Sequence, residues 1–362
     1  MNAVASHGFW ARRLARAFAY PQTTSRYGAL LLPALAPAAE AGQRIHARVV
    51  STTRETAHTR SIVLRPGRGW RGHHAGQFVT LYVNRDGVWQ PRCYSISSAE
   101  TDRRRIRLTI RAQSPEGVSH YLVHQLAVGA RVQISQAAGD FTLAAGSADR
   151  GRLFISAGSG ITPIMGMLES GAAGEDVQHL HYARRRDDLI FGDRLGSMGA
   201  RSQRYRLHLR LTAEGAGHLD QEILDETCPD WREREVWVCG PERLLNTAEQ
   251  LWQQAGLSDR LHVERFGLPT MQDVDPDDGG QVHFAASGRD ARAEGGRSLL
   301  AVAEAAGLSP RHGCRMGICH SCDCVLASGA VRDLRTGKLT VTPGVRIQPC
   351  VSAAVGPVTL DL

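Results

Sequence analysis

The sequence predicts a multidomain chain in which an antiparallel β barrel is followed by a doubly wound α/β domain and then by a smaller α+β domain. Short strand-like runs separated by turn residues indicate the barrel. Apolar strands that alternate with helical segments indicate a parallel, doubly wound sheet. A strand and a helix that lead into a loop with three closely spaced cysteines indicate the third domain. A chain of 362 residues has room for these three domains, each with its own core.

Composition and cysteine usage exclude several classes of protein. Lys338 is the only lysine, and the arginines behind the net charge of +7 are scattered, so we do not expect nucleic-acid binding. No apolar run reaches the roughly 18 to 20 residues of a membrane span. Four isolated cysteines are expected to stay reduced, which favours a cytoplasmic location: Cys93, Cys228, Cys239 and Cys324.

Residues 1–44 form an extension ahead of the barrel. Apolar side chains repeat there at near-helical spacing, with arginines between them: Phe9, Trp10, Leu14, Ala17 and Phe18. One hypothesis is a helix that packs on the next domain. The other is a basic amphipathic helix that holds the chain peripherally at the inner membrane face or on a membrane-bound partner.

The barrel is predicted over residues 45–147. Its strand-like runs are residues 46–50, 61–64, 78–83 and 106–110. Between the last two runs lies a further extended segment, in which alternation places Arg92 and Tyr94 on the same face of a strand. Ser95 follows directly.

Groups in this barrel match the needs of a flavin, which are an aromatic face beside the ring, a donor near the reactive nitrogen N5, and cations or N–H groups for the phosphates. Tyr94, Ser95 and Arg92 supply one of each. Further along, residues 117–119 begin a predicted helix, whose first amides and hydroxyl suit an anion. Each pattern is common alone, but the two in this order inside one barrel predict a flavin site.

Residues 148–268 are predicted to form the second domain. A strand at residues 152–156 is followed by a turn with Gly158 and Gly160 and by a helix that begins near Thr162. A strand, a glycine turn and a helix N-terminus form a pyrophosphate site, because glycine lets the backbone approach the phosphates. A purely structural turn is the alternative. Further strands are expected at residues 177–182, 206–211 and 236–238.

The residues after the second strand of this domain bear on the choice of nucleotide. Arg184 and Arg185 follow that strand, at the place where the 2′-phosphate of NADPH would lie, and arginine suits that anion. An exposed arginine cluster without this role is the alternative. We expect NADPH as the substrate, with NADH as the alternative.

Four cysteines near the C-terminus predict an iron–sulfur cluster. Four residues separate Cys314 from Cys319, two separate Cys319 from Cys322, and Cys350 follows after a long gap. This is the spacing of a plant-type 2Fe–2S loop, whose first three thiolates come from one tight turn. Zinc is the alternative, although zinc sites usually hold two short cysteine pairs. The four cysteines are therefore the predicted cluster ligands.

The cysteine loop belongs to a domain predicted over residues 281–362, behind a linker at residues 269–280. The linker is acidic and contains proline and glycine, which predicts a flexible segment on which this domain swings. A strand at residues 282–284 and a helix at residues 298–307 precede the cysteines.

Through these motifs, residues 45–265 resemble the ferredoxin–NADP reductase superfamily, and residues 280–362 resemble the β-grasp domain of ferredoxins. The resemblance implies FAD in the barrel, with FMN as the alternative. It puts Arg92 on the flavin phosphate, Tyr94 on the isoalloxazine ring and Ser95 at N5. The other residues that it places around the flavin and its pyrophosphate are Gln77, Phe78, Gly117, Val118 and Ser119.

The same resemblance assigns roles in the nucleotide domain. Thr162 and Cys239 flank the nicotinamide and join Tyr94 and Ser95 as the expected catalytic residues. Ala213 stands where NADPH-using relatives often carry a second arginine. The full set expected at the nucleotide is Gly158, Gly160, Thr162, Pro163, Arg184, Arg185, Cys239, Gly240 and Pro241. Phe266, at the end of the domain, is expected near the flavin, with a core position as the alternative.

The resemblance implies an oxidoreductase that passes electrons from NADPH through FAD and the cluster to a protein acceptor. A flavin is needed because nicotinamide gives electrons in pairs and the cluster takes them one at a time. The domain order and the extension are most similar to the electron-transfer partners of membrane diiron desaturases and hydroxylases. The alternatives are a reductase for a soluble ring-hydroxylating or demethylating oxygenase, a redox-sensing regulator, and a direct reductase of oxygen or a quinone.

Overall fold

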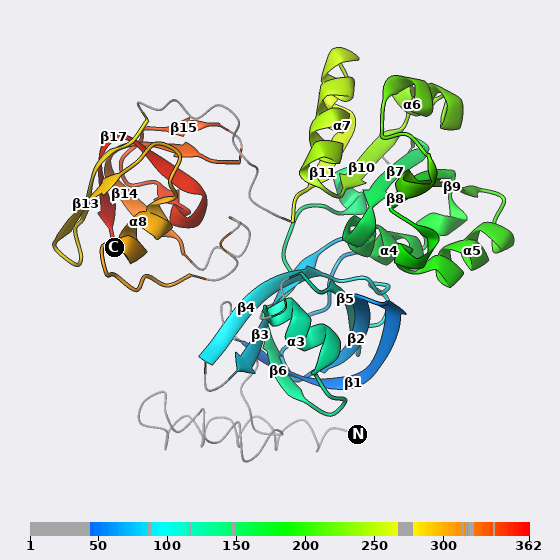
Figure 1. Ribbon diagram of the computed structural model, residues 1–362, viewed down its shortest axis with the longest axis horizontal. Helices are drawn as coiled ribbons and strands as arrows, with labels where there is room; N and C mark the ends of the chain where they lie inside the picture. The colour runs from blue at the N-terminus through cyan, green and yellow to red at the C-terminus, as the bar shows by residue number, and fades with distance from the viewer. Residues whose placement is uncertain are drawn as a thin grey trace, which may run out of the picture.

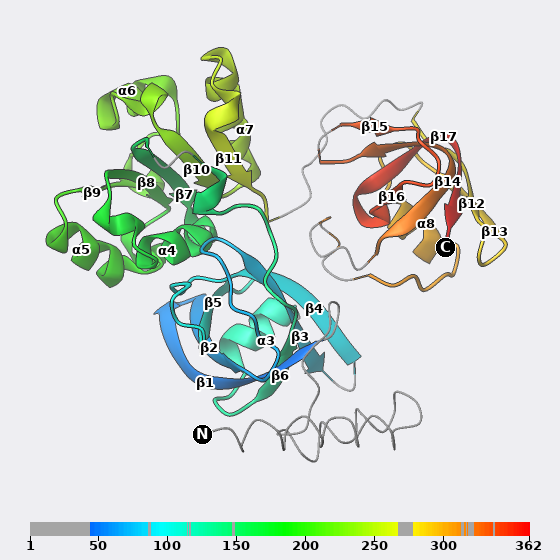
Figure 2. The ribbon, with the colours of Figure 1, turned by 180° about the vertical axis from the view of Figure 1, so that it is seen from behind.

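The computed structural model describes residues 44–85, 88–113, 115, 117–146, 149–266, 278–312, 315, 317, 322–335 and 337–362. They form three domains, each built on one sheet (Figures 1 and 2). The predicted extension falls outside the described residues except for Arg44, and the predicted linker falls outside them except for residues 278–280. Within the described ranges, no helix is long and apolar enough to cross a membrane.

The first domain is a six-stranded antiparallel sheet in the order β4-β3-β6-β1-β2-β5. A bridge between Ile96 and Leu108 joins the chain after β4 to β5, so the two edges of the sheet meet and the predicted barrel is confirmed. Its elements are β1 (Ile45–Thr56), β2 (Thr59–Pro66), β3 (Phe78–Arg85), β4 (Val88–Ser95), β5 (Ile106–Arg111), α3 (Val118–His124) and β6 (Arg131–Ile134).

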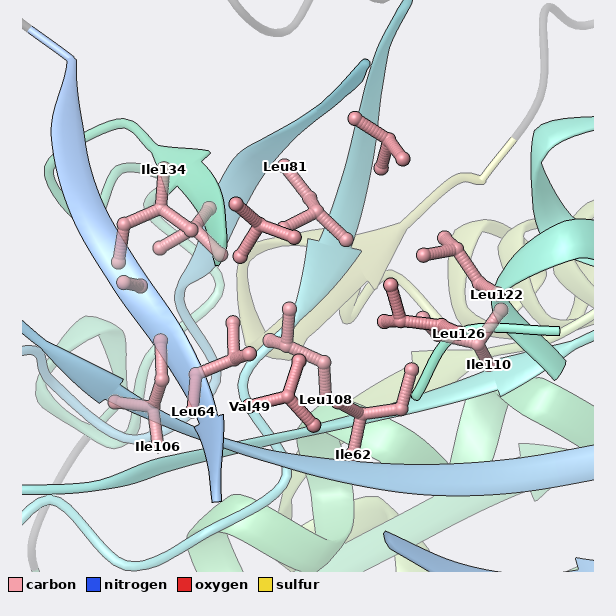
Figure 3. Packing of buried hydrophobic residues seen from close by; sticks show 14 of the residues in the cluster. Val49, Ile62, Leu64, Leu81, Ile106, Leu108, Ile110, Leu122, Leu126 and Ile134 are labelled. Atoms are coloured by element: carbon pink, nitrogen blue, oxygen red, sulfur yellow. The ribbon is translucent and has the colours of Figure 1, made fainter. Parts of the chain in front are cut away.

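The barrel is held together by branched aliphatic side chains that point inward from its strands (Figure 3). Ile62, Leu64 and Leu108 are fully buried there, and Leu122 closes one end from α3. Burying each such side chain contributes about 1.5–3 kcal/mol. This rigid core fixes the positions at which β4 and β5 end.

The second domain is a parallel sheet in the order β11-β10-β7-β8-β9, so the predicted doubly wound sheet is confirmed. Helices α4 and α5 pack on one face of it and α6 and α7 on the other. Its elements are β7 (Arg152–Ala157), α4 (Ile161–Glu169), β8 (Val177–Ala183), α5 (Gly192–Arg201), β9 (Tyr205–Leu211), α6 (Gln221–Thr227), β10 (Glu235–Cys239), α7 (Glu242–Gln254) and β11 (Leu261–Glu264).

A chain of buried polar groups links three neighbouring strands of this sheet, β7, β8 and β9. The Ser156 hydroxyl lies 2.8 Å from Nε2 of His179 and 2.7 Å from Nδ1 of His181, and Nδ1 of His179 lies 2.7 Å from the Tyr205 hydroxyl. Burial lowers the pKa of His181 to about 4, so its ring is neutral in the folded domain. Because the unfolded chain binds protons at a pKa near 6.5, this neutral ring stabilises the fold above that pH and costs stability as the pH falls toward 4.

The third domain is a mixed sheet in the order β13-β12-β17-β14-β15, with β16 also paired to β14 and with α8 packed on it. Strands β12 and β17 run parallel, and the other pairs are antiparallel. Strand β12 begins at Gly280, the last residue of the predicted linker. The elements are β12 (Gly280–Phe284), β13 (Arg289–Ala293), α8 (Leu299–Ala305), β14 (Cys324–Asp333), β15 (Leu339–Thr340), β16 (Arg346–Ile347) and β17 (Ser352–Asp361).

Helix α4 is seated directly on the barrel. A Cβ atom added at Gly166 would lie 2.6 Å from the carbonyl oxygen of Ile96, so only glycine permits this approach. Beside it, the largely buried Arg107 guanidinium lies 2.8 Å from Glu169 at the end of the helix. The Arg107 guanidinium also donates to the carbonyl of Ser97 within the barrel. The barrel and the nucleotide domain therefore meet through a close backbone contact with an ion pair at its edge.

We predict that Gly166→Ala destabilises the protein by about 1–3 kcal/mol, because the new methyl group overpacks a contact with rigid backbone. Gly199→Ala in α5 is the matched control, since nothing lies within 4 Å of the added Cβ. That change should be neutral or stabilise by about 0.4–1 kcal/mol. Urea unfolding of both variants measures the difference, and equal stabilities would contradict the close contact.

Candidate functional site

A pocket of about 370 Å³ opens where the barrel meets the nucleotide domain. Its volume lies in the range of small-molecule sites. Most of its wall comes from the barrel, from Phe78, Arg92, Cys93, Tyr94, Ser95, Thr109, Ile110, Arg111, Gln113 and Ser119. The rest comes from the nucleotide domain and the cysteine loop, from Ser159, Thr162, Glu264, Phe266 and Arg315.

The end of β4 brings three of the predicted flavin residues into this wall. Arg92, Tyr94 and Ser95 all line the pocket, and Phe78 lies opposite Ser95 in the register of β3 and β4. Burial raises the pKa of Tyr94, so its phenol is neutral and presents an aromatic surface. The wall therefore offers an aromatic ring, a hydroxyl and a guanidinium, which are groups that fit a flavin.

The second predicted flavin motif enters the pocket through Ser119 alone. Val118 is buried in the barrel core, and Gly117 is the residue before α3. The Ser119 hydroxyl accepts a hydrogen bond of 3.2 Å from the backbone N–H of Gln113, which also lines the pocket. Gln77 is not among the lining residues, because its side-chain amide bonds to the backbone of the barrel at residues 74 and 139.

Arg111 is a lining residue that the sequence interpretation missed. It is the last residue of β5, and its guanidinium lies 3.4 Å from the position of a Cβ at Gly158. It therefore sits between the barrel and the glycine turn of the nucleotide domain, where a cation suits a phosphate. An arginine at a strand end is too common for the sequence to single it out.

The two glycine turns of the nucleotide domain pack against one another. A Cβ at Gly160 would fall on the carbonyl group of Cys239, so the turn after β7 touches the turn after β10. Thr162 and Ser159 reach the pocket from the first turn, and the Thr162 hydroxyl donates to the Ser159 carbonyl over 2.9 Å. Cys239 is fully buried behind this wall, and burial raises the pKa of its thiol well above the usual range.

Other residues expected at the nucleotide lie at the carboxyl ends of β7, β8 and β10, which are neighbouring strands, and do not line this pocket. Arg184 and Arg185 are exposed directly after β8. Pro163 is buried in the first turn of α4, and Pro241 precedes α7. Dinucleotides bind across the carboxyl ends of the strands in such sheets, so these residues keep their predicted role as a proposal.

Glu264 is the most consequential residue that the sequence interpretation missed. It ends β11, pairs in register with Cys239 and lines the pocket beside Phe266. Burial, with a smaller contribution from the charge of Asp140, raises the pKa of Glu264 to about 7. Nothing in its sequence context marks it, because only the fold brings the end of β11 to the end of β4.

Two of the four predicted cluster ligands, Cys322 and Cys350, lie among the described residues, and their geometry fits a metal cluster. The sulfur atoms of Cys322 and Cys350 lie 3.3 Å apart, which is too far for a disulfide. Thiolates that each bind a metal at about 2.3 Å are compatible with this separation. Both side chains are buried beside Leu300 and Val351. Cys314 and Cys319 lie outside the described residues.

Arg315 connects the cysteine loop with this pocket. It follows predicted ligand Cys314 in sequence and lines the same pocket as Tyr94. Its backbone has a left-handed φ of 59°, and its guanidinium makes two hydrogen bonds, of 3.0 and 2.6 Å, to the Glu304 carboxylate. The loop predicted to hold the cluster thus reaches the wall of the predicted flavin site.

Comparison with protein-family models agrees with the three domains. An oxidoreductase FAD-binding domain matches residues 46–143, an oxidoreductase NAD-binding domain matches residues 154–250, and a 2Fe–2S iron–sulfur cluster binding domain matches residues 282–354.

Curated relatives match most of the chain. An NADPH oxidoreductase of Mycobacterium tuberculosis is 40% identical over 328 residues, which cover 88% of this chain and 85% of the relative. A glycine betaine monooxygenase reductase subunit of Pseudomonas aeruginosa is 31% identical, over 79% of this chain and 86% of the relative. The reductase subunit of a stachydrine N-demethylase of Rhizobium meliloti is 33% identical, over 74% of this chain and 81% of the relative. Phthalate dioxygenase reductase has the same fold, with a TM-score of 0.60 at 22% identity over 88% of this chain and 98% of its own.

We predict that the rate of flavin reduction by NADPH inflects near pH 7 in the wild type and loses this inflection in Glu264→Gln. Asp140→Asn should move the inflection to lower pH, because it removes a negative charge that raises the pKa of Glu264. Stopped-flow absorbance over a pH series measures both effects. An unchanged profile in Glu264→Gln would assign the titration to another group.

The same shift has a consequence for stability. A carboxyl pKa raised from 4.5 to about 7 favours the folded state at low pH, and this contribution is lost as the pH rises through 7. Glu264→Gln should therefore gain stability relative to the wild type above pH 7.

Proposed function

The chain belongs to the ferredoxin–NADP reductase family, in the form that joins FAD-binding, NAD-binding and 2Fe–2S domains, and within this family we propose that it delivers electrons from NADPH to an oxygenase component. It is an NAD(P)H-dependent oxidoreductase whose cofactors are FAD and a 2Fe–2S cluster. The acceptor, the preferred nucleotide and the roles of individual residues form the proposal.

The observation that carries the proposal is that all three domains contribute to one pocket. Tyr94 comes from the barrel, Thr162 from the nucleotide domain and Arg315 from the cysteine loop. A reductase of this kind needs its nucleotide and its cluster loop at the same flavin. This convergence also argues against a direct reductase of oxygen or a quinone, in which the cluster loop has no reason to reach the flavin.

When bound, FAD takes electrons in a pair from NAD(P)H and releases them singly, which couples the nucleotide to the one-electron cluster. The residues of the pocket prepare the site for this reaction. Tyr94 offers an aromatic surface that covers a ring, and Ser95 holds a hydroxyl beside it. Glu264 binds or releases a proton near neutral pH, and Cys239 stays uncharged behind the wall.

The names of the relatives support an oxygenase as the acceptor. Two of those described above are reductase subunits of a glycine betaine monooxygenase and of a stachydrine N-demethylase. The expected membrane diiron desaturase or hydroxylase remains a second prediction. It depended on the domain order and on the extension at residues 1–44, and all of the extension but Arg44 lies outside the described residues. None of the relatives described above is named for a desaturase. The oxygenase hypothesis goes with a cytoplasmic location, and the desaturase hypothesis with peripheral attachment to a membrane.

NADPH is the proposed nucleotide because Arg184 and Arg185 are exposed at the end of β8, and because the relative from Mycobacterium tuberculosis is named an NADPH oxidoreductase.

The acceptor is tested by mixing the protein, reduced anaerobically with NADPH, with a purified oxygenase component of a glycine betaine monooxygenase. A purified acyl desaturase in lipid vesicles is tested in parallel. We expect the cluster absorbance to recover with the oxygenase and to stay bleached with the desaturase. Cys350→Ser is the control, because loss of a cluster ligand should stop delivery while NADPH still bleaches the flavin. Recovery with the desaturase alone would overturn the proposal.

The nucleotide is tested with Arg184→Ala, which should raise KM for NADPH about tenfold or more, since a hydrogen bond to a charged group contributes about 1.5–3 kcal/mol. KM for NADH should not change, because NADH lacks the 2′-phosphate. Arg201→Ala, which removes another exposed arginine at the end of α5, controls for net charge. An equal rise for both nucleotides in Arg184→Ala would contradict the assigned contact.

A further inference from the structure

Arg335 lies outside the predicted cluster motif, yet its side chain reaches into the cysteine loop. Its Nη1 atom donates a hydrogen bond of 2.6 Å to the carbonyl oxygen of Gly317, which lies between Cys314 and Cys319 in sequence. The side chain is 29% exposed, so this contact is partly shielded from water. A guanidinium held in this way places a positive charge against the backbone of the loop.

The same guanidinium is held from two further directions. Nε and Nη2 of Arg335 donate to the two carboxylate oxygens of Asp333, over 3.2 and 2.7 Å, in a forked pair. Nη2 also donates to Oε1 of Gln348 over 3.2 Å, and Gln348 lies two residues before Cys350. One side chain therefore joins the loop with three predicted ligands to the segment with the fourth.

Gly317 makes this approach feasible. Its φ is +68°, and a Cβ atom there would lie 2.6 Å from both Nη1 of Arg335 and Cγ2 of Val351. The backbone at Gly317 thus lies directly against Arg335 and against the residue that follows Cys350. A backbone hydrogen bond of 2.7 Å from the N–H of Leu334 to the carbonyl of Val351 joins the residue before Arg335 to the residue after Cys350.

We propose that Arg335 is a positioning residue of the iron–sulfur centre, which holds the three-cysteine loop against the Cys350 segment and raises the reduction potential of the cluster. The forked bonds to Asp333 fix the direction of the guanidinium, and the bond to Gly317 fixes the loop. Reduction adds a negative charge to the cluster, and a nearby cation favours the more negative state.

This inference rests on the cluster ligands proposed above. The variants distinguish a failure of the inference about Arg335 from a failure of the ligand assignment. Arg335→Gln removes both the positive charge and the forked hydrogen bonds to Asp333, whereas Arg335→Lys keeps the charge but cannot make the forked hydrogen bonds. Arg332→Gln is the matched control, because Arg332 is also 29% exposed, pairs with a carboxylate, that of Asp278, and donates to the carbonyl of Gly337. Cys322→Ser tests the ligand assignment itself.

Two measurements on the purified, cluster-loaded protein test the role without relying on turnover. The first is the rate at which an iron chelator bleaches the cluster, and the second is an anaerobic redox titration of the cluster followed by EPR. We expect at least tenfold faster bleaching in Arg335→Gln and Arg335→Lys. We also expect a lower potential in Arg335→Gln, by about 59 mV for a tenfold change in the one-electron equilibrium. Arg335→Lys should stay near the wild-type potential.

Arg332→Gln should match the wild type in both measurements. If Arg335→Gln bleaches and titrates like Arg332→Gln, the inference is overturned while the proposed function stands. If Arg335→Gln assembles no cluster, the test depends on Arg335→Lys. A cluster that the chelator bleaches at the wild-type rate in Arg335→Lys would overturn the positioning role. A cluster that persists unchanged in Cys322→Ser would instead overturn the ligand assignment.

Discussion

The close approach of α4 to two other backbones is the constraint on which the pocket depends. Gly166 lets the helix rest on the carbonyl of Ile96 in the barrel, and Gly160 lets the turn before it touch the carbonyl of Cys239. These contacts have no flexible side chain between them, so they tolerate little displacement. They bring Thr162 into the same pocket as the end of β4, so the predicted nucleotide turn of one domain and the predicted flavin wall of the other share one pocket.

Burial then sets the charge of the groups around that meeting point. Tyr94 and Cys239 are held neutral because burial raises the pKa of each. The same effect brings the pKa of Glu264 to about 7, and Arg92 and Arg111 line the same pocket. The wall therefore has arginines that suit phosphates and one carboxyl that changes charge near neutrality. A site that receives a pair of electrons with a proton is served by such a group.

The sequence allowed prediction of those parts of the site that depend on neighbours along the chain. Alternation along one strand brought Arg92 and Tyr94 to the same pocket, and a strand followed by a glycine turn located Thr162. Glu264 and Arg111 were not predicted as site residues, because they join the site only when β11 and β5 end beside β4 in space. A single acidic or basic residue at a strand end carries no local signal, and long-range packing decides its function.

Arg315 and Arg335 show how one loop is held for two purposes. Arg315 lies at the flavin pocket and is tied to Glu304 of α8, whereas Arg335 ties Gly317 to the segment before Cys350. The first contact relates the loop to the predicted flavin site, and the second relates the loop to the segment that carries the predicted fourth ligand. A centre that gains and loses charge in each cycle works best when surrounding dipoles need not reorganise. Each arginine also makes a forked pair with a carboxylate, Arg315 with Glu304 and Arg335 with Asp333, so the two side chains that contact the loop are themselves fixed in direction.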